Sequence, residues 1–345
     1  MRILIIDKVI TELMHAKQTI LYGLRERGII IVSSLKKKSG LKVIGVFQPQ
    51  KATTHKLQNK EKVFFHLENE DLKCCIISID GALTPIKFKI VNYTSDFNKR
   101  NKGIVDESVL QEATITIIGL GSGGAGITNE LVRCGVTNFK LNDFDTISLS
   151  NLCRSEYNLL DVGKKKTKVM REKLQKINPC INVELYDESI MDMDIEKLEK
   201  IIDSSDLIIE ATDSPQTKIL INGLAYNKKP VIYPAVYEHG RGGDILLTMP
   251  GLPCYECVFK SIIDDIPTSK KRDWDYSTGQ AKPMPALISD IQIVISRTVK
   301  IALAILTAGT QDSFFEKITE PGCTLLRINN ERNDLVPNKT FYEEW

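Results

Sequence analysis

The sequence predicts an α/β protein with a doubly wound, mostly parallel Rossmann-like sheet and a small N-terminal α+β domain. From residue 113 onward, short apolar runs alternate with amphipathic helical patterns, which is typical of a parallel sheet covered by helices on both faces. Residues 1–92 instead show several short apolar runs after one helical pattern, which favours an α+β unit. The length of 345 residues, at about 150 residues per domain, also suits two domains.

Within residues 1–92, the apolar periodicity predicts one helix over Ile10–Gly28. The expected strands are Ile29–Ser33, Leu41–Phe47, Val63–His66, Cys74–Ile79 and Ile86–Val91. The domain lacks a His/His/Asp metal cluster, so a working isopeptidase is not expected here. Two roles stay open for it: recognition of a substrate tail, which can extend a sheet edge, or bracing of a dimer.

Residues 93–112 are expected to form an arm or linker, because the stretch around Lys99, Arg100 and Lys102 is polar and basic.

The second domain is expected over 113–345. Its predicted strands are Ala113–Ile118, Phe139–Leu141, Asn182–Tyr186, Leu207–Ala211 and Val231–Pro234. Its predicted helices are Gly124–Cys134, Lys164–Ile177, Ile195–Ser204 and Pro215–Asn227. The tail beyond Thr310 is expected to be irregular.

Composition argues against several classes of protein. The 46 basic and 44 acidic residues leave a net charge of +2, which gives no support for a nucleic-acid partner. Even the apolar stretch Ile291–Leu306 contains Arg297 and Lys300, so no membrane span is expected. Eight cysteines are too few for a disulfide-stapled scaffold, which favours a reducing, cytoplasmic setting.

The segment TITIIGLGSGG (Thr114–Gly124) places Gly119, Gly121 and Gly124 in a G-x-G-x-x-G spacing between an apolar strand and an amphipathic helix. Such glycines allow a tight turn and let a phosphate approach the backbone amides at the helix N-terminus. Asp143 follows about 20 residues later, at the end of the next expected strand, where an acidic residue can accept hydrogen bonds from a ribose. The pattern predicts a nucleotide site without distinguishing NAD from ATP.

Cations further along the chain favour ATP. The stretch DFDTISLSNLCRS (143–155) contributes Arg154, and DVGKKKTKV (161–169) contributes Lys164–Lys166. A triphosphate needs cations over its β and γ phosphates, whereas a nicotinamide needs a neutral path. A cationic helix N-terminus is also electrostatically unfavourable without an anion nearby. The lysine run therefore favours a bound polyphosphate.

The ordered motifs LNDFDTISLSNLCRS and VGKKK, with the glycine loop before them, resemble the MoeB/ThiF/HesA family of adenylating enzymes over about residues 95–310. Ubiquitin-activating enzymes and the microcin C adenylating enzyme share this domain. The resemblance implies the ubiquitin-activating-enzyme adenylation fold, a homodimer, and an adenylyltransferase that uses ATP and Mg2+. Such enzymes form an acyl-adenylate at the C-terminal carboxylate of a small ubiquitin-like or sulfur-carrier protein and release pyrophosphate.

The resemblance also implies roles for individual residues. Asp143 would hold the ribose, and Asn151 and Arg154 would contact the phosphates. Lys166 would neutralise charge at the α-phosphate, and Asp213 of IEATDSP would hold the magnesium. No general base is expected, because a C-terminal carboxylate is already ionised at neutral pH.

Two further positions bear on this assignment. The family sends an arginine from an N-terminal arm into the partner subunit's site, and Arg100 of DFNKRNKG lies in the corresponding place. The alternative for Arg100 is an exposed linker residue. Ser155 stands where the family usually has glutamine, so a secondary phosphate contact is not carried over.

The cysteines match the family only in part. Cys254 and Cys257 in GLPCYECVF match the first of two C-x-x-C pairs that bind a structural zinc in many members. The second pair is missing, because Cys323 is the only later cysteine, and structural zinc needs four ligands. The crossover stretch 269–290 also lacks the cysteine that forms a thioester in members that transfer the acyl group onward. The resemblance therefore predicts adenylation. It gives little support for zinc and does not predict a thioester within residues 269–290.

Three alternative functions stay open. An enzyme that adenylates a ribosomal peptide in peptide tailoring would differ only in its substrate. A non-catalytic ThiF-like scaffold subunit would be expected to have lost at least one of the predicted site residues. An NAD-dependent oxidoreductase explains the glycine loop and Asp143 but leaves Arg154 and Lys166 without a role.

Overall fold

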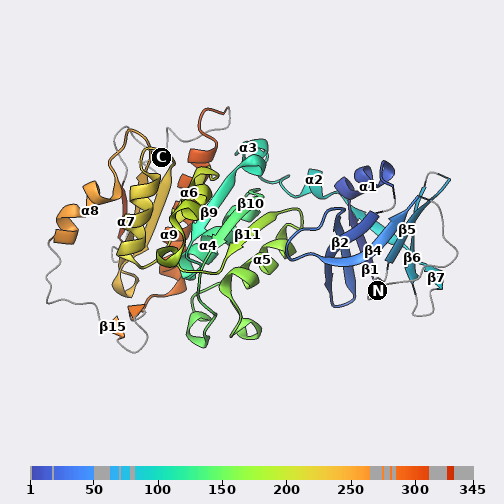
Figure 1. The fold of residues 1–345 in the computed structure, drawn as a ribbon, viewed down its shortest axis with the longest axis horizontal. Coiled ribbons are helices and arrows are strands. Elements are labelled where there is room, and N and C mark those ends of the chain that lie inside the picture. The colour runs from blue at the N-terminus through green and yellow to red at the C-terminus, as the bar shows by residue number, and fades with distance from the viewer. Residues whose placement is uncertain are drawn as a thin grey trace, which may run out of the picture. The chain divides into compact units, whose positions relative to one another are not determined.

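The computed structural model describes residues 2–17, 19–49, 63–69, 71–77, 82–264, 274–275, 280–281, 285–310 and 325–329 (Figure 1). The chain divides into two compact units. The first comprises Met1–Glu112, Val132–Phe139 and Met170–Glu184. The second comprises Ala113–Leu131, Lys140–Val169 and Leu185–Trp345.

The first unit contains a sheet with eight described strands in the order β7-β6-β5-β4-β2-β3-β1-β8. Strand β1 pairs in parallel with β3 and β8, whereas β2 pairs antiparallel with β3 and β4. The strands are β1 (Arg2–Ile6), β2 (Thr19–Glu26), β3 (Ile29–Ser34), β4 (Lys42–Gln48), β5 (Val63–Glu68), β6 (Asp71–Ile77), β7 (Leu83–Pro85) and β8 (Phe88–Val91). Helix α1 (Asp7–Met14) follows β1 directly.

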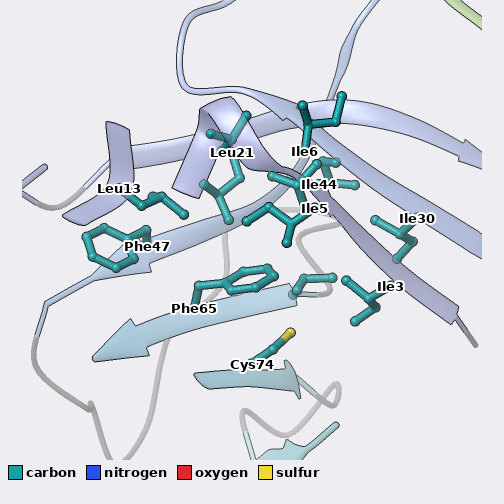
Figure 2. Close-up of a cluster of buried hydrophobic side chains, with 13 residues drawn as sticks. Ile3, Ile5, Ile6, Leu13, Leu21, Ile30, Ile44, Phe47, Phe65 and Cys74 are labelled. Carbon is teal, nitrogen blue, oxygen red and sulfur yellow. The ribbon is translucent and has the colours of Figure 1, made fainter. Parts of the chain in front are cut away.

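An apolar cluster joins α1 to the strands of this unit (Figure 2). Ile3 and Ile5 point to the same face of β1, because successive side chains of a strand alternate between faces. Leu13 of α1, Phe47 of β4 and Phe65 of β5 are fully buried in the same cluster. Each such side chain stabilises the fold by about 1.5–3 kcal/mol, so the cluster holds α1 against the sheet.

The predicted helix Ile10–Gly28 is confirmed only as far as Met14 and is wrong beyond it. Helix α1 ends at Met14, and β2 occupies Thr19–Glu26 with pairing strands on both sides. Within β2, a Cβ at Gly23 would lie only 1.8 Å from the carbonyl oxygen of Ile31, so the strands approach closely there. Pairing with neighbouring strands therefore overrides the helical periodicity of the sequence.

The other strands expected in this unit are confirmed as elements, with Ser78 and Ile79 lying outside the described residues. The sequence patterns do not predict β1 or β7. Within residues 93–112, the structure has two short helices, α2 (Tyr93–Asp96) and α3 (Glu107–Glu112), joined by turns.

The later turns of α5 (Lys166–Ile177) belong to the first unit. Gln175 Nε2 donates to the carbonyl oxygen of Ser39 at 2.7 Å, and Arg171 donates to the Ser39 hydroxyl. Lys176 pairs with Glu26 at 2.8 Å. The first unit is therefore assembled from three separate stretches of sequence.

The second sheet has seven described strands in the order β11-β10-β9-β12-β13-β14-β17. Strands β9, β12 and β13 are parallel neighbours, whereas β14 and β17 add on in antiparallel pairing. The strands are β9 (Thr114–Ile118), β10 (Asn138–Asn142), β11 (Asn182–Tyr186), β12 (Leu207–Glu210), β13 (Val231–Val236), β14 (Gly242–Thr248) and β17 (Leu325–Asn329). The five predicted strands of this domain are confirmed. The tail beyond Thr310 supplies β17, which corrects the expectation that it is irregular.

Helices cover both faces of this sheet. All four residues of β12 are buried, and since their side chains alternate between faces, both faces must be covered. Helices α6 and α7 share one core with β12, β13 and β14, while α9 packs against β13 and β14. The helices are α4 (Ser122–Arg133), α6 (Ile195–Asp203), α7 (Pro215–Ala225), α8 (Tyr255–Asp264) and α9 (Ile288–Leu306), with 3-10 turns η1 (Leu149–Asn151), η2 (Leu159–Asp161), η3 (Ile190–Asp192) and η4 (Glu238–Gly240).

The predicted fold class is thus confirmed, and the four helices predicted after residue 113 are all present. Two short strands, β15 (Trp274–Asp275) and β16 (Gln280–Ala281), form a separate antiparallel pair. Across the described part of the chain, none of the helices combines the length and the apolar character needed to cross a bilayer.

Candidate functional site

The glycine loop joins β9 to α4, and its glycines meet different steric demands. Gly119 has a φ of +87°, and a Cβ there would lie 3.0 Å from Thr212 Cγ2. A Cβ at Gly124 would lie 1.9 Å from the carbonyl oxygen of Gly119, so only glycine lets the first turn of α4 pack this closely. At Gly121, a Cβ would meet no atom of the described residues within 4 Å, so the backbone is open to close approach by a ligand. These are the three roles of glycine in a nucleotide-binding loop.

The strand order places this loop where the chain reverses its direction of travel across the sheet. Strand β9 lies between β10 and β12, and the ends of all three meet: Gly119 N donates to Asn142 O, and Ala211 N donates to Ile118 O, both at 2.8 Å. In open α/β sheets, ligands bind outside the carboxyl ends of the strands at such a point. The loop after β9, Asp143 after β10 and Asp213 after β12 all follow these ends.

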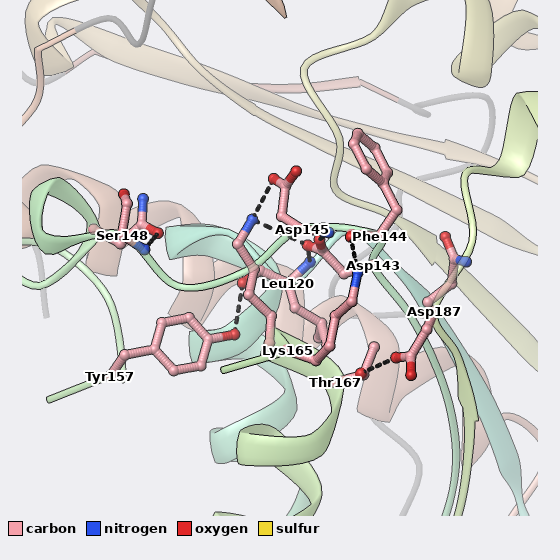
Figure 3. A network of polar contacts seen from close by, with 12 residues as sticks. Leu120, Asp143, Phe144, Asp145, Ser148, Tyr157, Lys165, Thr167 and Asp187 are labelled. Carbon is pink, nitrogen blue, oxygen red and sulfur yellow. Dashed lines mark hydrogen bonds and ion pairs between the residues drawn. The ribbon is translucent and has the colours of Figure 1, made fainter. Parts of the chain in front are cut away.

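Asp143 ties the glycine loop to the segment after β10 (Figure 3). Its buried carboxylate accepts from Leu120 N at 2.7 Å through Oδ2 and from Asp145 N at 2.8 Å through Oδ1. A carboxylate has about four acceptor positions. These two bonds and the contact of Lys166 Nζ with Oδ2 use about three of these positions, which leaves one for a ribose hydroxyl, the role predicted for Asp143.

Lys166, the first residue of α5, lies between two carboxylates. Its Nζ is 2.7 Å from Asp145 Oδ2 and 3.4 Å from Asp143 Oδ2, and only 9% of its side chain is exposed. An ammonium removed from water needs such partners, because desolvation disfavours the charged form. The sequence predictions include Lys166 and Asp143 but miss Asp145, for which the D-x-D spacing is the available signal.

Tyr157 is a second residue that the sequence reasoning misses. Its buried hydroxyl donates to the carbonyl oxygen of Leu120 at 2.8 Å, so Leu120 is held at its amide by Asp143 and at its carbonyl by Tyr157 (Figure 3). Burial, assisted by the nearby Asp143 carboxylate, raises the pKa of Tyr157 above its ordinary value, so the hydroxyl stays a donor. A single tyrosine after the SNLCR motif gives no sequence signal for this role.

Asn151 and Arg154 lie in the segment between β10 and α5. Asn151 ends η1, where its Oδ1 accepts from Ser148 N at 3.0 Å and its carbonyl oxygen accepts from Ser155 Oγ at 2.6 Å. The half-buried Arg154 donates its backbone N–H to the same carbonyl at 3.3 Å. Asn151 thus fixes the turn that carries Arg154. The phosphate contacts expected of both side chains stay predictions.

Asp213 lies in the loop from β12 to α7, and its side chain is exposed. The preceding residue, Thr212, lies against Gly119, which brings this loop to the glycine loop. Within the described residues, no group of three or more His, Cys, Asp or Glu side chains is placed to hold a metal. A single carboxylate still suits Mg2+, which usually keeps several waters and binds substrate phosphates through one or two protein carboxylates.

Cys254 and Cys257 lie together at the start of α8. Their Sγ atoms are 3.3 Å apart, and Cys254 Sγ accepts from Cys257 N at 3.4 Å. Burial alone would raise the pKa of Cys254, but hydrogen bonds from Cys257, Asn222 and Glu256 together outweigh it and hold the pKa below its ordinary value. Cys323 lies outside the described residues, as does most of 269–290. The two thiols are half of the ligand set that a structural zinc requires.

Arg100 lies in the turns between α2 and α3 of the first unit, and its side chain is exposed. The turns are anchored on either side of it, because Asn98 is buried and Asn101 Nδ2 donates to Arg133 O at 3.2 Å. The contribution of Arg100 to a partner's site stays a prediction.

The chain is similar to known proteins in sequence and in fold. Residues 97–324 match the ThiF family. A sulfur carrier protein adenylyltransferase from Thermus thermophilus is 31% identical over 157 residues, which cover 44% of this chain and 56% of that protein. A molybdopterin-synthase adenylyltransferase from Escherichia coli is 28% identical over 172 residues, which cover 49% of this chain and 68% of that protein. The chain thus spans little more than half the length of the first of these relatives.

Two solved structures share the fold. PaaA superposes with a TM-score of 0.53 at 19% identity, covering 63% of this chain and 75% of that one. The E. coli MccB structure with AMPCPP and MccA superposes with a TM-score of 0.51 at 19% identity, covering 69% of each chain. At such identities the likeness extends to the fold alone.

The hydrogen bond from Leu120 N to Asp143 yields a local test. We expect Asp143→Ala to speed amide hydrogen exchange at Leu120 by about 10- to 100-fold, because a hydrogen bond to a charged group contributes about 1.5–3 kcal/mol. Exchange followed by NMR or mass spectrometry measures this. Asp145→Ala is the matched control, since it removes a neighbouring carboxylate and keeps the Leu120 acceptor. Equal protection of the Leu120 amide in Asp143→Ala and in the wild type would show that the hydrogen bond to Asp143 does not hold the glycine loop.

Proposed function

Because the chain belongs to the ThiF family, we propose that it adenylates the C-terminal carboxylate of a small ubiquitin-like or sulfur-carrier protein. In this reaction a carboxylate oxygen attacks the α-phosphorus of ATP, the bond from that phosphorus to the bridging oxygen breaks, and pyrophosphate leaves. The names of the relatives, adenylyltransferases of a sulfur carrier protein and of molybdopterin synthase, support the reaction class.

The observation that carries this proposal is the buried Lys166 held beside the glycine loop. Asp143 contacts both the loop amide of Leu120 and the Lys166 ammonium, so one carboxylate sets the cation next to the expected phosphate position. Hydride transfer from a nicotinamide dinucleotide needs no cation at the reacting centre. Reaction with a nucleoside triphosphate does need one, since attack by a carboxylate brings together two groups of like charge.

The described residues fit ATP with magnesium. The opening at Gly121 and the amides that begin α4 suit phosphate oxygens, and Asp143 retains acceptor capacity for a ribose. The exposed Asp213 would hold Mg2+, whose role when bound is to neutralise phosphate charge. For a structural zinc, Cys254 and Cys257 supply two of the four ligands required, and the described residues contain no group of three or more candidate ligands.

Lys166 is proposed to exchange partners when ATP binds. The side chain of Asp145 is 36% exposed and that of Asp143 is 7% exposed. Water can therefore solvate the Asp145 carboxylate more readily once that carboxylate loses its contact with Lys166. An incoming α-phosphate would then replace Asp145 at Nζ, while Asp143 keeps the lysine aligned. The ammonium needs no proton transfer in this exchange, and neither does the ionised substrate carboxylate.

We further propose that the enzyme is a homodimer in which Arg100 reaches the partner subunit's site. The resemblance of DFNKRNKG to the family's N-terminal arm and the exposure of the Arg100 side chain support this arrangement. A second positive side chain at the phosphates would absorb charge that develops on the leaving pyrophosphate.

Nucleotide preference can be measured without the protein substrate. At about 100 times its dissociation constant, a ligand stabilises the native state by roughly 2.7 kcal/mol, so Mg·ATP should raise the melting temperature by several degrees. NAD at the same concentration is the control and should leave it unchanged. A shift with NAD alone would contradict the proposal, and no shift with either would favour a scaffold subunit.

Adenylation should depend on Lys166 and on Asp213. We expect Lys166→Ala and Asp213→Ala each to slow pyrophosphate release by about 100-fold or more, since one group that stabilises developing charge contributes on that scale. Release is measured with candidate carrier proteins, each compared with its C-terminally amidated form. Lys164→Ala is the matched control, because Lys164 is in the same lysine run but is 54% exposed and paired with Asp161. Wild-type rates in the two site variants would refute the site assignment.

A shared site makes Arg100 testable by complementation. Arg100→Ala and Lys166→Ala should each be inactive alone, whereas an equal mixture should regain about a quarter of the wild-type activity, because half the dimers are mixed and each has one intact site. Lys102→Ala in place of Arg100→Ala is the control and should be active alone. Absence of recovery after subunit exchange, verified by native mass spectrometry, would contradict the crossing arm.

A further inference from the structure

A buried ion pair lies directly behind the Asp213 loop. Glu210, the last residue of β12, is fully buried, and Lys218 of α7 is 10% exposed, with Nζ 2.5 Å from Glu210 Oε2. Burying two charges costs desolvation free energy that their attraction often fails to recover, so such a pair is weak evidence for a purely stabilising role. The other hydrogen bonds of Glu210 and Lys218 therefore indicate what role the pair has.

Both charged groups hold Thr212, the residue before Asp213. Lys218 Nζ donates to the carbonyl oxygen of Thr212 at 2.7 Å. Glu210 Oε1 accepts from the Thr212 backbone N at 3.3 Å and from the Thr212 hydroxyl. The backbone donor, the backbone acceptor and the side chain of Thr212 are thus all fixed by one ion pair.

The residue after Asp213 is fixed as well. Ser214 N donates to Thr212 Oγ1 at 3.3 Å, and Ser214 Oγ accepts from Thr217 N at 3.2 Å as the N-cap of α7. On its other side, Thr212 lies against the glycine turn, where Gly119 leaves room for its methyl group. The exposed Asp213 therefore projects from a backbone that is held on both sides and abuts the glycine loop.

We propose that Glu210 and Lys218 are positioning residues that hold the Asp213 carboxylate ready for the Mg2+ of bound ATP. The inference rests on the proposed function, which places Mg2+ at Asp213. Groups held in place before the ligand arrives spare the cost of ordering them on binding. Burial raises the pKa of Glu210 and Lys218 opposes that shift, so removal of Lys218 would favour a protonated Glu210 that accepts hydrogen bonds poorly.

The test measures ATP binding to the full chain by calorimetry, with and without Mg2+, and needs no protein substrate. Lys218→Met removes the ammonium, and Thr212→Val removes the hydroxyl that both Glu210 and Ser214 N contact while leaving the charges in place. We expect each variant to lose about tenfold or more of the Mg2+-dependent gain in ATP affinity, the scale seen when partners of metal ligands are removed. ATP affinity without Mg2+ should stay within about twofold of wild type, and Lys218→Arg, which retains a donor, should recover part of the gain.

Lys140→Met is the matched control. Lys140 is also buried, and its Nζ donates to the carbonyl oxygens of Ser204 at 3.0 Å and Ile201 at 3.4 Å, at the end of α6. Its loss should lower the melting temperature while the Mg2+-dependent gain stays as in wild type. If Lys218→Met does not fold, as judged by circular dichroism, Thr212→Val decides the question.

Two results would overturn the inference. A wild-type Mg2+-dependent gain in Thr212→Val and in every folded Lys218 variant would leave the pair a purely structural role. Absence of any Mg2+-dependent gain in the wild-type protein would overturn the proposed magnesium site itself and the positioning role with it. The first failure appears only in the variants and the second already in wild type, so the two are distinguishable.

Discussion

Asp143 accepts hydrogen bonds from two backbone amides while it lies within reach of the buried Lys166 ammonium, so three segments of chain meet at one carboxylate. Because that carboxylate is buried, each donor it lost would leave a poorly solvated negative charge, and the three contacts support one another. The glycine loop, the segment after β10 and the start of α5 are therefore fixed together. Tyr157 completes the arrangement from the other side of Leu120, at a carbonyl group that Asp143 does not reach.

Electrostatic balance explains how the proposed nucleotide site can contain several carboxylates. Lys166 sits between Asp143 and Asp145, so two carboxylates of the protein itself compensate the buried cation. Further along the sheet, Glu210 and Lys218 neutralise each other behind Asp213. In the proposed site, Lys166 and Asp213 would face the phosphates. The charges of Glu210 and Lys218 are buried and paired with each other. Such an arrangement limits the reorganisation that charge development on a leaving group would otherwise require.

The sequence predicts strands β9 to β13 of the second sheet and the glycine loop, because near-continuous apolar strands and glycine spacing are local signals, but it misses β14 and β17. The prediction fails at Ile10–Gly28, where β2 is a strand because it pairs with β3 and β4. Such pairing depends on other segments of the chain and gives no pattern within the strand's own sequence. In the site, Gly119, Gly121, Gly124 and Asp143 are predicted from their spacing, whereas the role of Asp213 comes from the family resemblance. Tyr157 and Lys218 are missed because each acts through a backbone carbonyl, of Leu120 and of Thr212, and such contacts depend on the folded path of the chain.

The first unit gathers stretches that are far apart in the chain, and this has a consequence for how the sequence can vary. Ser39 bonds to Arg171 and Gln175 of α5, the helix whose first residue is Lys166. A change at Ser39 would remove the hydroxyl that Arg171 contacts, whereas the carbonyl oxygen that accepts from Gln175 would remain. A change at Arg171 or Gln175 would leave the hydroxyl or the carbonyl oxygen of residue 39 to be satisfied anew. Among homologous chains, substitutions at these positions should therefore covary. The N-terminal segment cannot be exchanged as a cassette unless α5 is altered with it.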